Sequence, residues 1–337
     1  MQNKPKDISH KKVTFDNPIP KDRLKLLYDY IVGRYSIHIN KDILKLPKEQ
    51  WYKDITDEEQ KKVFMRYKFC NVRREHDRYT LWIIDNVLTK KDASLQDKIY
   101  RTILYRIYNS LFAAELIDLA NIDFARVNLK KIRKSIEDLN VRPSMMYGKA
   151  FRTVSMKTSL NKVYHDDLRI EPVLFVKDLW KEKFADKILA CETAEEVTNA
   201  LKTKNGIGDF LSYQIFVDLT YIPEFPFSEN EHVIAGPGCR FGLEIFYDTK
   251  ELPPTDDLLF YLSDNLVELW KEQGLVFDPD KVFYDLLKRD RRINVMCLEN
   301  CFCEYQKFYS ILHGKHRRVY RGVDYDKKRF NEVKKDK

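Results

Sequence analysis

Thr193–Tyr221 reads TAEEVTNALKTKNGIGDFLSYQIFVDLTY, and this stretch indicates the fold more specifically than any other part of the chain. Two helices are expected, joined by a turn that consists of Asn205, Gly206, Ile207 and Gly208. Glycine permits a tight turn, and the aliphatic residue is expected to anchor it in the core. The turn amides and the N-terminus of the next helix can face a phosphate. The pattern predicts a helix-hairpin-helix that binds the DNA backbone, with a plain helical hairpin as the alternative.

The rest of the chain also has a helical pattern. Only 10 of its 337 residues are glycine, 44% are hydrophobic and 33% are charged, which does not suit an all-β sandwich with many tight turns. Apolar periodicity and capping residues predict helices at 21–35, 56–69, 77–90, 95–121, 124–139, 173–201, 239–247, 256–273, 279–290 and 293–313. We expect a mostly α fold with a flexible arm at 1–20, a helical domain at 21–313 and a basic tail at 314–337. The domain is expected to have two lobes, with a possible boundary near 144–172, where periodicity is weak.

Several classes of protein are disfavoured by what the sequence lacks. No uncharged apolar run approaches the roughly 18 residues of a membrane span, and the N-terminus has no apolar stretch typical of a secretory signal. Six cysteines at irregular spacing do not resemble a disulfide framework. No GxxxxGK[ST] motif occurs, which argues against a nucleoside-triphosphate kinase. The expectation is an intracellular protein without membrane association.

Positive charge is concentrated in two segments. The net charge is +8, and the excess of Lys and Arg over Asp and Glu lies in 61–78 and 285–337. Such segments favour a surface that faces a polyanion, and a solvated helix face with a basic tail is the alternative. Within the first segment, Arg74 and Arg78 could clamp phosphate oxygens through paired hydrogen bonds, and Asn71 could contact a base edge. The alternative is an intrahelical salt-bridge ladder that includes Arg74 and Asp77.

The hairpin is followed by a segment that combines acids, glycines and an arginine. Helix-hairpin-helix DNA glycosylases have a catalytic carboxylate a few residues beyond the second helix, and Glu229 and Glu231 have a similar place here. Gly236 and Gly238 flank a proline before the predicted helix at 239–247, which is typical of an anion-binding turn, with Arg240 beside it. A structural Ω-loop is the alternative.

Three cysteines lie close together near the C-terminus. Cys297, Cys301 and Cys303 do not have the spacing of a zinc or iron–sulfur site, so we expect buried structural cysteines and no metal. The polar residues Glu299, Glu304 and Lys307 on the same helix are of more interest.

Taken together, these blocks resemble the helical proteins of phage thymine hypermodification. That family includes the helical domain of 5-hydroxymethyluracil DNA kinases and the α-glutamyl/putrescinyl thymine pyrophosphorylases, also called amino acid:DNA transferases. The matching elements, in chain order, are Arg34 and His38; Phe69, Asn71, Arg74, Glu75, Asp77 and Arg78; the hairpin with its following Asp218; Glu229–Leu243; and Cys303, Glu304 and Lys307. One element departs from the family pattern, because Asn230-Glu231-His232 stands where Asp-Asp-Phe is expected.

The resemblance implies a DNA-glycosylase-related fold that acts on a base in double-stranded DNA. The implied reaction transfers an amino acid or polyamine onto phosphorylated or pyrophosphorylated 5-hydroxymethyluracil, without a cofactor, and a separate 5-hydroxymethyluracil DNA kinase supplies the phosphate. A glycosylase that acts on a modified pyrimidine and a non-catalytic DNA-binding partner of the kinase are the alternatives. The implied location is the host cytoplasm for a phage protein or the nucleus for a eukaryotic one.

The reaction assigns roles to the singled-out residues. Access to the base requires flipping it from the stack, and Tyr213 or Phe241 could then stack on it. Replacing a phosphate by an amine requires charge stabilisation of the leaving group and a base for the amine proton. The leaving phosphates are assigned to Arg74, Arg78 and Arg240 with Gly236 and Gly238. The base is assigned to Glu231, with Asp218, Glu229 and Asp77 as alternatives.

Overall fold

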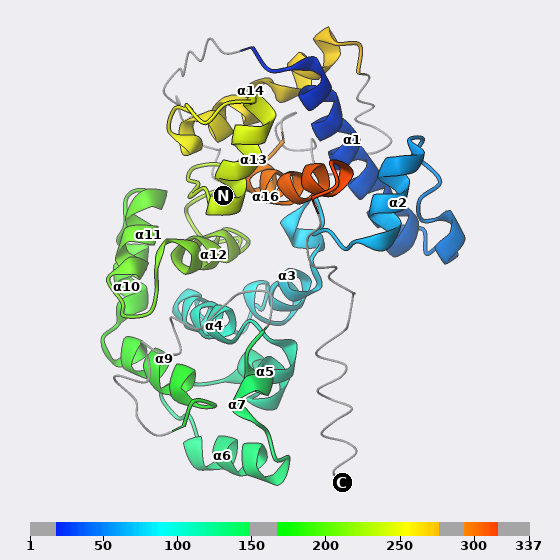
Figure 1. Ribbon diagram of the computed structural model, residues 1–337. Helices are drawn as coiled ribbons and strands as arrows, with labels where there is room; N and C mark the ends of the chain where they lie inside the picture. The colour runs from blue at the N-terminus through cyan, green and yellow to red at the C-terminus, as the bar shows by residue number, and fades with distance from the viewer. Residues whose placement is uncertain (1–17, 149–166, 276–292, 316–337) are drawn as a thin grey trace. The chain divides into compact units, whose positions relative to one another are not determined.

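The computed structural model describes residues 18–148, 167–275 and 293–315. Helices form most of this part of the chain, which contains no strand, so the predicted mostly α fold is confirmed (Figure 1). Most of the predicted arm and tail, and the predicted helix at 279–290, lie outside the described residues. No described helix is both long and apolar enough to cross a bilayer.

The described chain divides into two compact units. One contains 78–148 and 167–232, and the other contains 18–77, 233–275 and 293–315. Most of the segment near 144–172, singled out above as a possible boundary, lies outside the described residues, and its described ends both belong to the first unit. The motif residues of the sequence are therefore distributed over two units, each of which has its own core.

The helices of the first unit surround a buried central helix. They are α3 (Arg78–Ile83), α4 (Leu95–Tyr108), α5 (Leu111–Leu116), α6 (Leu129–Asp138), α7 (Pro143–Met146), α9 (Glu171–Lys181), α10 (Phe184–Leu189), α11 (Ala194–Lys202) and α12 (Asp209–Leu219). Every residue of α4 from Lys98 onward is buried, and α4 packs against α9, α10 and α12. A helix that is buried on all sides must satisfy its polar side chains internally.

Two helices joined by a glycine turn are present at the predicted place in the first unit. Thr193 and Glu196 form a reciprocal capping box at the start of α11. Gly206 has a φ of 89°, a conformation that glycine adopts without a steric penalty, and α12 follows from Gly208 as its N-cap. Ile207 is buried, which confirms its predicted anchoring role.

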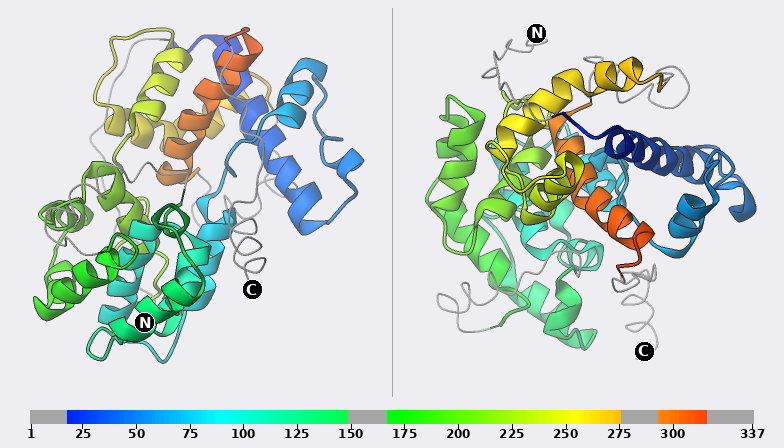
Figure 2. Two further views of the ribbon diagram at one scale, coloured as in Figure 1. Left: turned by 60° about the horizontal axis from the view of Figure 1, so that its bottom comes forward. Right: turned by 45° about the horizontal axis from the view of Figure 1, so that its top comes forward.

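The second unit is built around α16, the last helix of the described residues. Its helices are α1 (Lys21–His38), α2 (Glu58–Arg66), α13 (Pro237–Tyr247), α14 (Thr255–Glu272) and α16 (Val295–Leu312). α16 packs against α1, α2, α13 and α14, as Figure 2 shows. Its closest neighbour is α13, because a Cβ atom at Gly242 would overlap the backbone of Phe302 and one at Gly238 would lie 2.7 Å from the Cys303 Sγ.

Several predicted helices are shorter than expected. The helix expected at 95–121 ends at Asn109, which adopts a left-handed conformation with φ 44°, and α5 follows as a separate helix. Asparagine tolerates this conformation better than most residues. The helices expected over 173–201 are α9, α10 and α11, and Lys183 with φ 54° separates the first two. Ser94 caps α4 as predicted, since its hydroxyl accepts from the Asp97 amide.

Candidate functional site

α16 of the second unit brings together four motif segments that are far apart in sequence. Arg34 on α1 donates to the Phe69 carbonyl at 3.2 Å and to the Asn71 side chain. The Asn71 amide donates to the His76 carbonyl at 2.7 Å, and Asn300 on α16 donates to the Asn71 carbonyl at 2.9 Å. The polar atoms of Asn71 therefore hold the basic segment in place, which is a different role from the predicted contact with a base.

Glu304 ties the same segment to α16. Its Oε2 accepts from the Cys70 amide at 3.3 Å, and its Oε1 accepts from Lys307 at 2.5 Å. The Glu304 side chain is only 5% exposed, whereas that of Lys307 is 39% exposed. Burial of a carboxylate requires such compensation, so this pair of motif residues ties the backbone at Cys70 to α16.

The basic segment is not a continuous helix. Arg74–His76 forms a single turn of 3-10 helix, and Arg73 before it is extended. The predicted alternative of an intrahelical ladder is therefore wrong, because 3.6-residue spacing does not extend through the segment. Arg73 forms an ion pair with Glu75, while Asp77 follows the 3-10 turn as its C-cap. Arg74, Glu75 and Asp77 belong to the second unit, and Arg78 begins α3 of the first.

At the predicted anion-binding turn, two backbone amides donate to carboxyl groups of the protein itself. The Gly236 amide donates to Glu299 Oε1 at 3.2 Å, and the Ala235 amide donates to Asp256 at 3.0 Å. Burial raises the pKa of Glu299 to about 7, against the lowering effects of the Gly236 amide and Arg74. The Gly236 amide is thus occupied by a side chain of the protein, and binding of an external anion at this turn remains a prediction.

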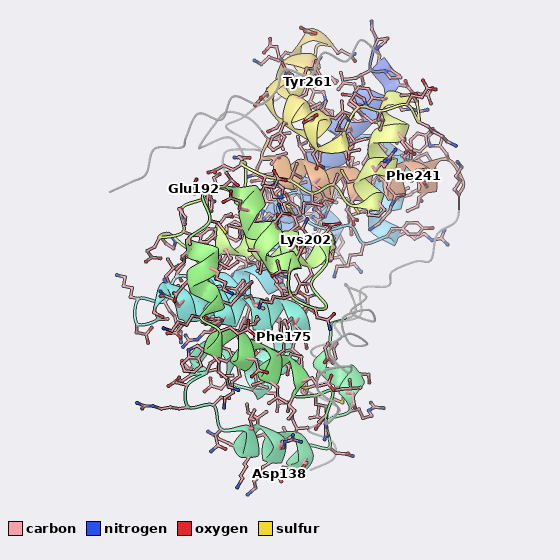
Figure 3. The ribbon with its side chains drawn as sticks, turned by 90° about the vertical axis from the view of Figure 1, so that its left-hand side faces the viewer. Asp138, Phe175, Glu192, Lys202, Phe241 and Tyr261 are labelled. Atoms are coloured by element: carbon pink, nitrogen blue, oxygen red, sulfur yellow. The ribbon has the colours of Figure 1, made fainter. Side chains whose placement is uncertain are left out.

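The remaining predicted residues of α13 lie on opposite faces. Gly238 faces Cys303 on α16, so close helix packing accounts for this glycine. Arg240 is exposed and pairs with Glu244 at 3.3 Å. Phe241 is 41% exposed (Figure 3), which leaves its ring available to a partner.

Two histidines stack beside the basic segment. The rings of His38 and His76 have centroids 4.1 Å apart and an interplanar angle of 19°, and His38 Nδ1 lies 2.9 Å from Asp42. Burial, together with the neighbouring His38 and Arg73, lowers the pKa of His76 to about 3. Burial also lowers the pKa of His38. Both rings are therefore neutral at pH 7, and the predicted motif residue His38 packs in the interior of its unit.

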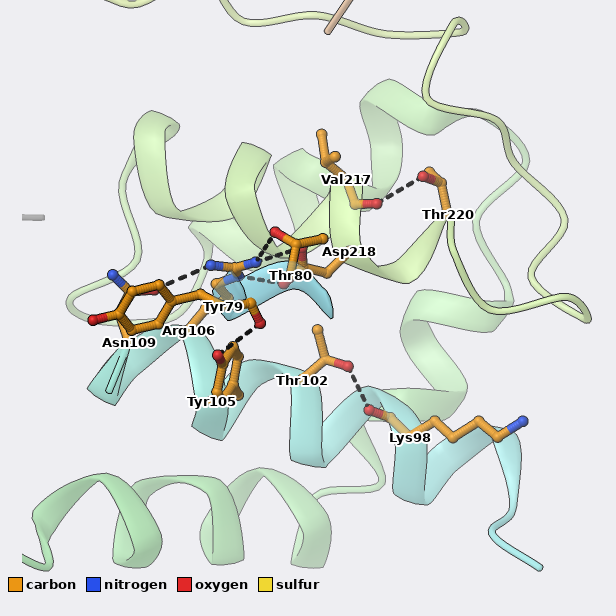
Figure 4. Close-up of polar contacts among 10 residues, drawn as sticks. All are labelled: Tyr79, Thr80, Lys98, Thr102, Tyr105, Arg106, Asn109, Val217, Asp218 and Thr220. Carbon is orange, nitrogen blue, oxygen red and sulfur yellow. Dashed lines mark hydrogen bonds and ion pairs between the residues drawn. The ribbon is translucent and has the colours of Figure 1, made fainter. Parts of the chain in front are cut away.

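Asp218 in the first unit is engaged by an arginine that was not among the predicted site residues. Arg106 on α4 forms a two-point ion pair with Asp218 on α12, with Nη2 to Oδ1 at 2.8 Å. It also donates to Asn109 at 3.0 Å and Thr80 at 3.3 Å (Figure 4). The sequence signal for this arginine is its place within the apolar run ILYRIYNSLF, where an unpaired charge would be costly.

The acidic loop after the hairpin lies in the first unit. Glu231 Oε1 accepts from the Ser228 amide at 2.9 Å, and Glu229 is half-buried. His232, at the position that departs from the family pattern, makes a 3.0 Å hydrogen bond with Thr198 of α11 and contacts the Tyr213 ring edge-on. Tyr213 is 1% exposed, so it is a core residue rather than a surface for stacking a base.

Two of the three cysteines that were predicted to be buried are buried in the structure. Cys297 and Cys301 are buried, and Cys303 is intermediate. Among the described residues, no three His, Cys, Asp or Glu side chains are grouped as a metal site. The absence of a metal remains a prediction.

Comparison with known proteins confirms the resemblance drawn from the motifs. A family model described as 5-hmdU DNA kinase, helical domain, matches residues 21–318. A 5-hmdU DNA kinase of Bacillus phage SP10 is 23% identical over 282 residues, which is 77% of this chain and 42% of that protein. The chain thus spans less than half the length of this relative. No solved structure matches the chain.

Proposed function

The chain belongs to the family of 5-hmdU DNA kinase helical domains, and from that membership we propose that it modifies a 5-hydroxymethyluracil-type base in DNA. The proposed reaction joins an amino acid or polyamine to the 5-methylene carbon and displaces a phosphate or pyrophosphate. The proposed reaction needs a phosphorylated base, which a 5-hydroxymethyluracil DNA kinase activity would supply.

The observation that carries this proposal is the assembly of four motif segments on α16. Arg74 and Lys307 are cationic groups of one unit that suit an anionic leaving group. A guanidinium can donate two parallel hydrogen bonds to a phosphate. The stacked histidines and the Arg34–Asn71 contact fix the chain on both sides of Arg74, which supports a preorganised backbone for this cation.

The hairpin of the first unit is the proposed contact to the DNA backbone. A Cβ atom added at Gly208 would have no other atom within 4 Å, so the backbone there is open to a ligand. The N-cap glycine provides no side-chain cap to α12, and helix N-termini of this kind bind phosphate. Arg78 and Arg240 are exposed and add positive charge to the proposed DNA-binding surface of their respective units.

The carboxylates differ in their suitability as the base. Asp218 is fully buried and both its oxygens are bound by Arg106, so we assign it a structural role. Glu231, Glu229 and Asp77 stay candidates. A carboxylate close to the hairpin also favours the second candidate function, a DNA glycosylase, because Glu229 and Glu231 follow α12 in the chain.

The decisive experiment analyses the nucleosides of treated DNA by mass spectrometry. DNA that contains 5-hydroxymethyluracil is incubated with a 5-hydroxymethyluracil DNA kinase, ATP, this protein and a pool of amino acids and polyamines. An amine-bearing thymidine derivative with release of phosphate or pyrophosphate is expected, and omission of the kinase should abolish it. Abasic sites without an adduct would indicate a glycosylase, and binding without either product would indicate a non-catalytic partner.

A further inference from the structure

We propose that Glu299 is the group that accepts the proton of the amine nucleophile, an inference that rests on the proposed transfer reaction. Glu299 lies on α16, next to Asn300, which binds the basic segment through the Asn71 carbonyl. It is therefore in the same unit as Arg74 and Lys307. No motif of the family resemblance includes this residue.

The carboxylate of Glu299 is fixed at one oxygen only. Oε1 accepts from the Gly236 amide at 3.2 Å, and a Cβ atom at Gly236 would lie 3.3 Å from this oxygen, so glycine permits the close approach. Within the described parts of the chain, Oε2 has no hydrogen-bond partner, and the side chain is only partly buried. An amine can therefore reach an oxygen whose orientation is already set.

Two carboxylates of the second unit's motif segments, Glu304 and Glu75, are less suitable. Glu304 is buried, with one oxygen bound by the Cys70 amide and the other by Lys307. Glu75 is bound by Arg73. To accept a proton, each would have to give up an ion pair in a partly dehydrated setting, which is costly.

The carboxylates near the hairpin are engaged or belong to the other unit. Asp218 forms its two-point ion pair with Arg106. Glu231 Oε1 accepts from the Ser228 amide and lies in the first unit, whereas the cation at Arg74 lies in the second. Glu299 shares a unit with Arg74, has one oxygen fixed by the Gly236 amide and has the other without a bound donor in the described structure, and it is not held in an ion pair as Glu75 and Glu304 are.

The electrostatic setting of Glu299 suits proton transfer near neutral pH. The charged and titratable groups that act on it are Arg74, Asp256, Glu304, Cys239 and Cys301. Burial is the largest effect and raises the pKa to about 7, with Asp256 and Glu304 raising it and Arg74 lowering it. A base is most effective when its pKa lies near the working pH.

The proposed step is balanced in protons and electrons. The amine arrives as an ammonium ion, and the carboxylate takes one proton from it. The nitrogen lone pair then forms a bond to the 5-methylene carbon, and the carbon–oxygen bond breaks with its electron pair on the departing phosphate or pyrophosphate. Arg74 offsets the negative charge on the leaving oxygen, and the proton on Glu299 passes to water.

The test compares Glu299→Gln, Glu299→Asp and the surface control Glu268→Gln, whose side chain is 67% exposed on α14. Glutamine keeps an oxygen for the Gly236 amide but cannot accept the amine proton. We expect transfer at pH 7 to fall by about 100-fold or more in Glu299→Gln, with unchanged DNA affinity. Glu299→Asp should recover part of the rate, and Glu268→Gln should match wild type.

The pH profile separates proton transfer from a structural role. The wild-type rate should fall below a pKa of about 7, and Glu299→Gln should lose this limb. A wild-type rate in Glu299→Gln, or a limb that persists in it, would overturn the inference. If glutamine impairs folding, a wild-type profile without an acid limb near pH 7 would overturn it as well. Failure of wild type to form any amine adduct would instead refute the proposed function.

Discussion

Arg106 and Asp218 form an ion pair across 112 positions of sequence, with both side chains at most 3% exposed. The pair joins α4 to α12, the second helix of the hairpin. It also explains how a central helix that is buried on every side contains an arginine, because the guanidinium is fully engaged by Asp218, Asn109 and Thr80. The hairpin is thereby attached to the core of its unit.

Breaking this pair on one side should destabilise the first unit strongly. Arg106→Leu leaves the Asp218 carboxylate buried without its partner, which typically costs about 3–5 kcal/mol. The double variant Arg106→Leu/Asp218→Leu should melt at a higher temperature than either single variant, because no charge is left buried. Thermal melts followed by circular dichroism measure this. If the loss of stability in the double variant equals the sum of the losses in the two single variants, the two residues are not coupled.

The hairpin should bind DNA without sequence preference. Gly208 has φ −95° and free space where a Cβ atom would be added, so Gly208→Val is expected to fold normally yet obstruct a phosphate at the turn. The DNA affinity of Gly208→Val should fall by a similar factor for duplexes of unrelated sequence. For wild type, log affinity should fall with log salt by about 0.9 per neutralised phosphate.

The control for the hairpin is Ala190→Val, an exposed position at the end of α10. It should bind DNA as wild type does. Fluorescence anisotropy with labelled duplexes measures both variants, and unchanged affinity in a folded Gly208→Val protein would remove the hairpin from the mechanism.

Arg74 should be needed as an arginine and not only as a cation. Arg74→Lys retains the charge but loses the two parallel donors. Transfer onto phosphorylated 5-hydroxymethyluracil DNA should drop by about 100-fold, which is the scale of losing one preorganised donor. The matched control is Arg66→Lys at the exposed end of α2, which should keep its activity. Wild-type turnover in Arg74→Lys would assign the arginine a structural role.

The stacked histidines should make the protein less stable in acid. The pKa of His76 is about 3 in the folded protein, well below the ordinary value of 6.5, so the unfolded chain takes up the proton first. The contribution of the neutral ring is complete above pH 6.5 and is lost progressively as pH falls towards 3. The melting temperature of His76→Gln should therefore decline less between pH 7 and 4 than that of wild type, and parallel declines would contradict the assignment.

Local features of the chain could be predicted from sequence because they depend on neighbouring residues. The capping box at Thr193 and Glu196, the turn at Gly206 and the buried Ile207 all appear where the pattern predicts them. The helical secondary structure could be predicted for the same reason, since caps and apolar spacing act within a few residues. The break at Asn109 was missed, because the apolar pattern continues across it and only the backbone conformation of one residue separates the two helices.

The sequence by itself determined that this is a helical chain, that it contains a glycine hairpin and that it has the ordered motifs of a DNA-base-modification family. Only the tertiary structure decided which of those motifs share a unit. Asn71, Glu304 and Gly236 meet around α16, whereas Asp218 is bound by Arg106 and is removed from the candidate bases. Some of these pairings join residues more than two hundred positions apart in the sequence. They therefore depend on how the helices pack and not on spacing along the chain. The same packing leaves one oxygen of Glu299 without a hydrogen-bond donor within the described residues.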